Sequence, residues 1–221
     1  MRFTRIGVIA GVPAELDALL PDHVREPLGD GAIARVAAGE RTLLLACRGI
    51  GKVAAAALAG ELVAGHGADL LAVVGTAGNI AGLGPGAYRV GEAIQADYGA
   101  RRAGRLIRYT AGEWPMGPAT CEAFRPLALS SVLPTARIAT SDLFVECGDH
   151  AAELAAELGA ELVDMETAAV AQAAALLGVP WIAVKAVSDD AGEGSGDSFS
   201  ANLASAAREA AAAFEALLNL A

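Results

Sequence analysis

Apolar residues along this 221-residue chain fall into short continuous runs, which alternate with longer stretches of helical periodicity. The short runs are rich in valine, isoleucine and leucine and end at glycine or polar residues, a pattern typical of buried strands. They predict strands at residues 5–12, 69–75, 88–99, 136–142, 160–165 and 180–190, and a hairpin over 32–47. The intervening segments predict helices at residues 13–20, 51–67, 150–159, 166–178 and 201–221.

Three segments lack either pattern and are predicted as loops: 76–86, 100–130 and the glycine-rich 192–198. Alternation of strands and helices predicts an α/β fold with a largely parallel sheet covered on both faces. We find no linker and no internal repeat, so one domain over residues 1–221 is expected. In such sheets ligands bind beyond the carboxyl ends of the strands, which directs attention to the residues that follow each strand.

Composition narrows the possible partners. The formal net charge of −10 opposes general binding to nucleic acid. The densest basic group lies in a predicted loop, where it forms either a solvated face or a binding patch; it comprises Arg101, Arg102, Arg105 and Arg108. No charge-free apolar run is long enough to span a membrane. The short apolar run at 5–12 is soon followed by Glu15 and Asp17, so it is interpreted as a first strand and not a targeting segment.

The three cysteines, Cys47, Cys121 and Cys147, are widely spaced and odd in number. Such spacing fits neither a disulfide framework nor a metal cluster. We therefore expect a reduced, cytoplasmic protein without a bound metal.

Carboxylates stand at three of the predicted strand ends: Glu15, Glu166 and Asp189. Each also has a purely structural explanation. Glu15 and Glu166 would lie in the first turn of a helix, where a negative charge is favourable by about 0.3–1 kcal/mol. Asp189 precedes a glycine-rich loop, where aspartate commonly forms turns. If the three converge, they indicate acid–base chemistry on a polar organic substrate.

The glycine-rich segments RGIGK and GTAGN do not match a known phosphate loop. Lys52 follows a glycine as in the P-loop, but Val53 stands where serine or threonine is required. The dinucleotide-binding fingerprint is also missing around residues 78–86. We interpret these glycines as positions where the backbone approaches a small ligand closely.

Six segments together carry a family resemblance: IGVIAGVPAEL, RGIGKVAAA, VVGTAGNI, SDLFVE, LVDMETAAVAQ and VKAVSDDAGEGSGDSF. Through them the chain resembles the nucleoside phosphorylase/nucleosidase superfamily, and within it most of all the methylthioadenosine/S-adenosylhomocysteine nucleosidases. The resemblance implies a single three-layer α/β/α sandwich domain with a twisted mixed, largely parallel sheet. It also implies a homodimer that hydrolyses the N-glycosidic bond of a 5′-substituted adenosine without a metal or organic cofactor.

The resemblance also implies roles for individual residues. Glu15 matches the acid that activates the attacking water, and Asp189, supported by Ser188, matches the aspartate that delivers a proton to purine N7. Met165 and Glu166 match a ribose-binding pair. The remaining expected substrate contacts are Phe144 and Val145 beside the purine, Thr76, Ala77 and Gly78 near the sugar, and Phe199 closing the base pocket.

These roles are chemically consistent. Glycosidic cleavage builds positive charge on the ribose and negative charge on the departing purine, so protonation at N7 improves the leaving group. Asp189 must then stay protonated until it acts, which requires burial or a hydrogen-bonding neighbour. Glu166 must be ionised to accept the ribose hydroxyls, and the positive end of its own helix favours that state.

Three other functions remain open at this point. A phosphate-dependent nucleoside phosphorylase is opposed by Glu15, because a carboxylate repels phosphate, and is kept open by Arg48. Differences from the nucleosidase pattern at Gly11-Val12, Pro13-Ala14 and Asp164 leave the substrate open to futalosine, aminofutalosine or adenosylhopane. A noncatalytic binding protein is the third. Trp114 and Met116 are candidates for a 5′ pocket or for a surface loop.

Overall fold

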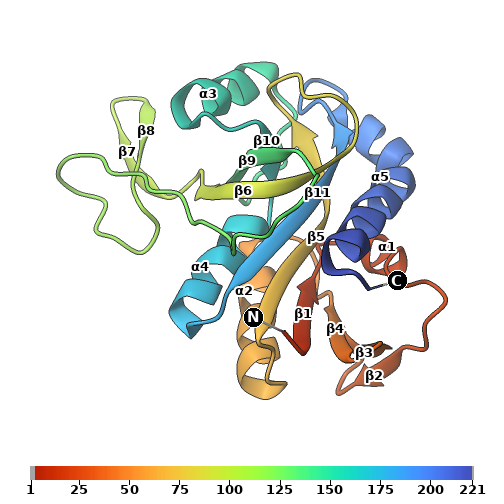
Figure 1. Cartoon of the computed structure of the whole chain (residues 1–221). Helices are drawn as coiled ribbons and strands as arrows, with labels where there is room; N and C mark the ends of the chain where they lie inside the picture. Colours follow the sequence, from red (N-terminus) through yellow and green to blue (C-terminus); the bar gives the residue numbers. More distant parts are fainter. Residues whose placement is uncertain (1–2, 221) are drawn as a thin grey trace.

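The computed structural model describes residues 3–220 and contains a nine-stranded sheet of order β10-β9-β6-β11-β5-β1-β4-β3-β2 (Figure 1). Its strands are β1 (Arg5–Ile9), β2 (Glu26–Leu28), β3 (Ile33–Ala38), β4 (Arg41–Ala46), β5 (Leu70–Asn79), β6 (Ala87–Gln95), β9 (Thr135–Thr140), β10 (Leu162–Asp164) and β11 (Trp181–Asp189). A separate hairpin consists of β7 (Gly99–Arg102) and β8 (Arg105–Arg108). It projects from the body of the molecule (Figure 1).

The sheet is mixed. Strands β4, β1, β5 and β11 run parallel at its centre, whereas β6 is antiparallel to β11, and β2 and β3 form an antiparallel edge. The short β10 pairs in parallel with β9 and also antiparallel with the end of β5. One half of the sheet is therefore closed by β10. The expected mixed α/β sheet is confirmed, but its parallel character is confined to part of it.

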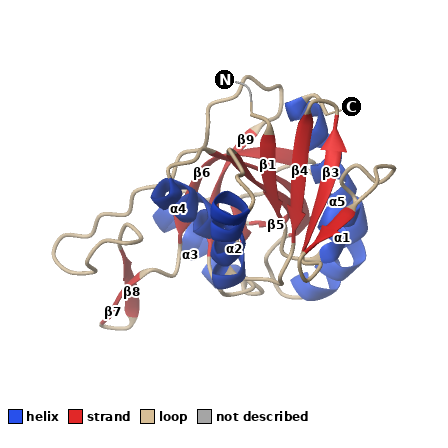
Figure 2. Cartoon of the chain, turned by 90° about the horizontal axis from the view of Figure 1, so that it is seen from below, coloured by secondary structure: helices blue, strands red, loops and turns tan. Residues whose placement is uncertain are grey.

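Helices pack on both faces of the sheet. They are α1 (Pro13–Asp17), α2 (Lys52–Gly60), its π-helical continuation η1 (Glu61–Gly65), α3 (Gly148–Leu158), α4 (Thr167–Leu177) and α5 (Ser195–Leu218). Side chains alternate along a strand, and in β1 Ile9 packs with the core under α2 and α4, while Val8 packs with the core under α1 and α5. Figure 2 shows α2 and α4 side by side, away from α1 and α5.

Strand β5 is longer than predicted. The sequence GTAGN was expected to begin a loop, but β5 continues to Asn79. The reason is that Gly78 and Asn79 pair with Val163 and Leu162 of β10, a contact between distant segments. The extra length carries β5 along the floor of the site described below.

Two other predicted loops contain regular structure. Residues 100–130 include the β7–β8 hairpin, which turns at Ala103 and Gly104, both with positive φ. Helix α5 begins at Ser195, within the glycine-rich segment, directly after the left-handed Gly194. It ends at Leu218, and the predicted end at Ala221 lies outside the described residues. No helix within residues 3–220 combines the length and apolarity needed to cross a membrane.

Candidate active site

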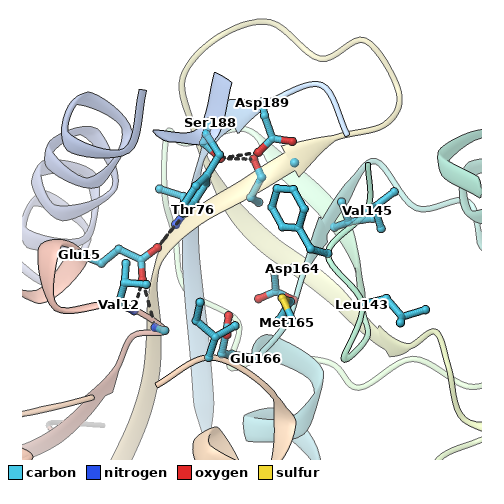
Figure 3. A pocket seen from close by; sticks show the side chains of 17 residues that line it. Val12, Glu15, Thr76, Leu143, Val145, Asp164, Met165, Glu166, Ser188 and Asp189 are labelled. Carbon is cyan, nitrogen blue, oxygen red and sulfur yellow. Dashed lines mark hydrogen bonds between the residues drawn. The ribbon is translucent and has the colours of Figure 1, made fainter. Parts of the chain in front are cut away.

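The carboxyl ends of β1, β5, β10 and β11 border one cavity, shown from close by in Figure 3. Every residue predicted to act in catalysis or substrate binding lines it: Glu15, Thr76, Ala77, Gly78, Phe144, Val145, Met165, Glu166, Ser188, Asp189 and Phe199. The sequence places these residues in six separate segments. The residues that follow β1 meet those at the ends of β5 and β11 because these three strands are parallel and present their carboxyl ends at the same edge. Strand β10 instead runs antiparallel to β5, and its pairing with Gly78 and Asn79 brings Met165 and Glu166 to the cavity.

Glu15 is fixed by four hydrogen bonds. Its Oε1 accepts from the backbone N–H of Thr76 at 2.7 Å and from the Thr76 hydroxyl at 2.9 Å, and its Oε2 accepts from the N–H groups of Gly11 and Val12 at 3.1 and 3.3 Å. Four donors stabilise a negative charge on this buried side chain. Pro13 opens helix α1 as predicted, and Glu15 points from its first turn toward β5.

Glu166 lies directly before helix α4 and is buried. Its Oε1 accepts a hydrogen bond from the backbone N–H of Gly51 at 3.0 Å. Burial raises the pKa of Glu166 to about 7, against the lowering effect of the Lys185 ammonium, and the carboxylate of Asp164 adds to the rise. The helix end was expected to favour the ionised form of Glu166, but burial opposes that form and outweighs it. The expected position is present, because the residue that precedes the helix also faces the cavity.

Asp189 ends strand β11 and is also buried. One carboxylate oxygen accepts from the Ser188 hydroxyl at 2.8 Å, and the other accepts from the backbone N–H of Ala191 at 2.9 Å. The side-chain amide of Asn202 in α5 donates to the Ser188 carbonyl at 2.9 Å, which ties this strand end to the helix. The burial expected for a proton donor is present; a protonated resting state of Asp189 stays a prediction.

An apolar wall faces these carboxylates. Phe144 and Phe199 meet edge to face, with ring centroids 6.0 Å apart. Val145 is buried, whereas Leu143 and Ile50 are more than half exposed at the rim of the cavity. The cavity thus combines apolar and aromatic side chains, suited to an aromatic base, with carboxylates suited to hydroxyl groups and ring nitrogens.

The residues on which two of the alternatives depended, the phosphate site and the 5′ pocket, lie outside the cavity. Arg48 is outside the cavity lining and pairs with Asp30 and Glu61, at 2.6 and 3.0 Å. Trp114 and Met116 are 80% and 64% exposed and also lie outside the lining, in the segment after the β7–β8 hairpin. Within residues 3–220, no arginine or lysine lines the cavity.

The basic group predicted in a loop belongs instead to the hairpin. Arg101 and Arg102 lie on β7, and Arg105 and Arg108 lie on β8. Arg108 is buried and forms ion pairs with Glu153 and Glu157 of α3, so it fastens the hairpin to that helix. A solvated loop was therefore the wrong interpretation for Arg108.

Sequence reasoning missed Lys185, which is 2% exposed beneath the site. Its Nζ lies 2.9 Å from Asp164 Oδ2 and 3.9 Å from Glu166 Oε2. A charged residue inside the apolar strand WIAVKAV was the available signal, since buried lysine is rarely unpaired. No cluster able to hold a metal ion occurs in the described part of the chain.

A sequence profile of the phosphorylase superfamily matches residues 5–219. The chain belongs to the phosphorylase superfamily. Among its relatives, the 5′-methylthioadenosine/S-adenosylhomocysteine nucleosidase of Actinobacillus succinogenes is 29% identical, with 93% of this chain and 94% of the relative covered.

Two solved structures share the fold of this chain. S-adenosylhomocysteine nucleosidase from Streptococcus pyogenes, in complex with 5-methylthiotubericidin, has a TM-score of 0.82 and 25% identity, covering 100% of this chain and 99% of that one. Futalosine hydrolase of Helicobacter pylori also has a TM-score of 0.82, at 21% identity and 98% and 97% coverage. The fold therefore accommodates hydrolases with different nucleoside substrates, and the site must decide between them.

Proposed function

We propose that this superfamily member is a purine nucleosidase that hydrolyses 5′-substituted adenosines, such as methylthioadenosine or S-adenosylhomocysteine, to adenine and the modified ribose. The observation that carries the proposal is the convergence of Glu15, Glu166 and Asp189 in one cavity with an apolar wall. The relatives named as methylthioadenosine/S-adenosylhomocysteine nucleosidases, matched over nearly the whole chain, support the same activity.

In this proposal each carboxylate has one task. Glu15, ionised and held by four donors, accepts a proton from the attacking water. Glu166 accepts hydrogen bonds from the ribose hydroxyls and stabilises positive charge on the sugar in the transition state. Asp189, with Ser188 beside it, donates a proton to purine N7 as the glycosidic bond breaks.

Substrate contacts complete the proposal. Phe144, Val145 and Phe199 form the base pocket, with the Val145 backbone at the purine edge. Met165 packs against the ribose, and Thr76, Ala77 and Gly78 line the sugar side along β5. Neither a metal nor an organic cofactor takes part.

Hydrolysis is favoured over phosphorolysis. Phosphate would have to enter a cavity that holds Glu15 and Glu166, and Arg48 is already paired with two carboxylates. We therefore expect water to be the nucleophile.

The experiment is adenine release from methylthioadenosine, S-adenosylhomocysteine and 5′-deoxyadenosine, each with and without phosphate. Release that is independent of phosphate supports the nucleosidase, and the preferred substrate defines the 5′ group. Release only with phosphate would assign a phosphorylase. If adenine is not released from any of the three, a futalosine-type or hopanoid nucleoside is tested next, and binding without turnover would indicate a binding protein.

We further propose a single three-layer α/β/α domain over residues 1–221 that forms a cytoplasmic homodimer. Helices on both sheet faces and the interleaved strand order support the single domain. The exposed Trp114 and Met116 are apolar side chains suited to a subunit contact. Light scattering after size-exclusion chromatography tests the dimer: a mass twice that of the chain supports it.

A further inference from the structure

Lys185 is buried beneath the cavity but has no part in the chemistry proposed above. It belongs to β11, the strand that lies between β5 and β6 in the sheet. It does not line the cavity, so it does not contact a bound nucleoside directly. A charged lysine at this depth is costly unless carboxylates compensate it.

Two carboxylates share this ammonium group. Asp164 Oδ2 lies 2.9 Å from Nζ, within direct ion-pair distance, whereas Glu166 Oε2 lies 3.9 Å away. Both side chains are almost fully buried. In the described part of the chain, Lys185 is the only cationic side chain paired with either of them.

The two carboxylates differ in their other partners. Asp164 accepts hydrogen bonds from the hydroxyls of Thr140 and Thr167 and from the backbone N–H of Thr167 at 3.0 Å. Glu166 accepts one protein hydrogen bond, from Gly51. Asp164 is thus well satisfied without Lys185, while the charge on Glu166 depends strongly on it.

We propose that Lys185 is a positioning residue whose charge is divided between Asp164 and Glu166, and that this division sets how much of Glu166 is ionised and able to bind ribose hydroxyls near neutral pH. The link to ribose rests on the proposed nucleosidase function. The link between Lys185 and the charge of Glu166 rests on the distances above and is independent of that function.

Every charged group that faces Glu166 enters this balance. Lys185 on β11 favours the ionised form, whereas Asp164 on β10 and Glu15 on α1 oppose it, as burial does. Burial alone would lower the pKa of Lys185, but the carboxylates of Asp164, Glu166 and Glu15 raise it above its usual value. Lys185 therefore stays charged across the pH range in which Glu166 titrates.

The proposal predicts opposite shifts from two variants. Lys185→Met removes the stabilising charge, so the titration midpoint of Glu166 should rise by about one pH unit or more. Asp164→Asn removes a repelling charge, and Glu166 becomes the only carboxylate of the two that still pairs with Lys185. The titration midpoint of Glu166 should therefore fall. Asparagine retains an oxygen that can accept from Thr167. Lys185→Arg keeps the positive charge and should restore a midpoint close to that of the parent.

The test is the pH titration of glutamate side-chain carboxyl carbons by NMR in the full-length protein, with the Glu166 signal assigned by its loss in Glu166→Gln. Arg35→Met is the matched control: it removes one positive charge from an exposed pair with Glu26 on the far edge of the sheet and should not move the midpoint. This readout needs no turnover, so failure of the nucleosidase assignment would leave it intact.

Steady-state kinetics then test whether the charge of Glu166 affects binding of the ribose. In Lys185→Met the acid limb of kcat/KM should move to higher pH, with KM at pH 7 raised more than kcat is lowered. Midpoints that stay unchanged in Lys185→Met and Asp164→Asn, or that move in the same direction, would overturn the proposal. If Lys185→Met does not fold, Asp164→Asn decides: a lower midpoint supports the proposal and an unchanged one rejects it.

Discussion

Glu15 and Thr76 are joined twice, because the same carboxylate oxygen accepts hydrogen bonds from the backbone N–H and the hydroxyl of Thr76. The two residues come from α1 and β5, so this double contact links the helix that carries the proposed base to the central strand of the site. The second oxygen of Glu15 is held by the loop after β1. The orientation of the proposed base is thus determined before substrate binds.

Replacing Thr76 by valine should remove one of these two bonds while preserving shape. A hydrogen bond to a charged group contributes about 1.5–3 kcal/mol, so kcat/KM should fall roughly tenfold to a hundredfold. Thr76→Ser keeps the hydroxyl and should remain within a few-fold of the parent. Equal rates for the valine and serine variants in adenine-release assays would show that the hydroxyl does not position Glu15.

Gly75 should tolerate no side chain. A Cβ atom at this position would collide with the carboxylate of Glu15. Complete loss of acid–base catalysis costs about a hundredfold or more in rate. Gly75→Ala should displace the proposed base without removing it, so we expect kcat to fall by at least about tenfold. Gly60→Ala, at the end of α2 where a Cβ meets open space, is the matched control and should retain full activity. Full activity in both variants would contradict the role of Glu15.

Asp189→Asn should abolish most turnover and leave the fold intact. Asparagine cannot donate a proton to purine N7, and general-acid catalysis contributes about 10²–10⁴-fold. The neighbouring Asp190 is exposed and does not line the cavity, so Asp190→Asn should behave as the parent does. Steady-state rates and circular dichroism check both statements, and near-normal turnover in Asp189→Asn would reject the acid assignment.

Glu166→Gln should stabilise the protein at alkaline pH. The folded-state pKa of Glu166 is raised from 4.5 to about 7, so its favourable contribution is complete below pH 4.5 and is lost as the pH rises through 7. The ionised form then costs on the order of 3 kcal/mol. Glutamine avoids this cost and can still accept from Gly51.

Urea unfolding of Glu166→Gln and the parent at pH 5 and pH 8 measures this difference. The variant should gain stability relative to the parent on going from pH 5 to pH 8, while its turnover falls. A stability difference that does not change with pH would mean that burial does not perturb Glu166.

The positions of the catalytic candidates were predictable because each directly follows an apolar run. The strands that carry or precede Glu15, Glu166 and Asp189 are recognisable from local composition. The edge rule for parallel strands brings the ends of β1 and β11 together, whereas Glu166 arrives through the antiparallel pairing of β10 with β5. The family resemblance then distinguished these acids from incidental helix-end charges. What the sequence indicated well was therefore local pattern combined with a general rule of sheet geometry.

Contacts between distant segments were not predictable in the same way. Lys185 lies within a strand that is buried along nearly all its length. Only the folded sheet shows that Asp164 Oδ2 lies 2.9 Å from its Nζ. Likewise, Gly78 and Asn79 carry turn-forming residue types, yet pairing with β10 makes them strand. In both cases tertiary pairing overrode the local preference.

The double pairing of β10 has a consequence for how the protein is made. Until residues 162–164 emerge from the ribosome, the last residues of β5 have no partner on the side that β10 later covers. A nascent chain that has completed β9 still presents an open strand edge, which is a template for association with other chains. Pairing of β10 with that edge also delivers Met165 and Glu166 to the cavity. The same step of synthesis thus covers the exposed edge and adds the proposed ribose-binding pair, before β11 and α5 supply Ser188, Asp189 and Phe199.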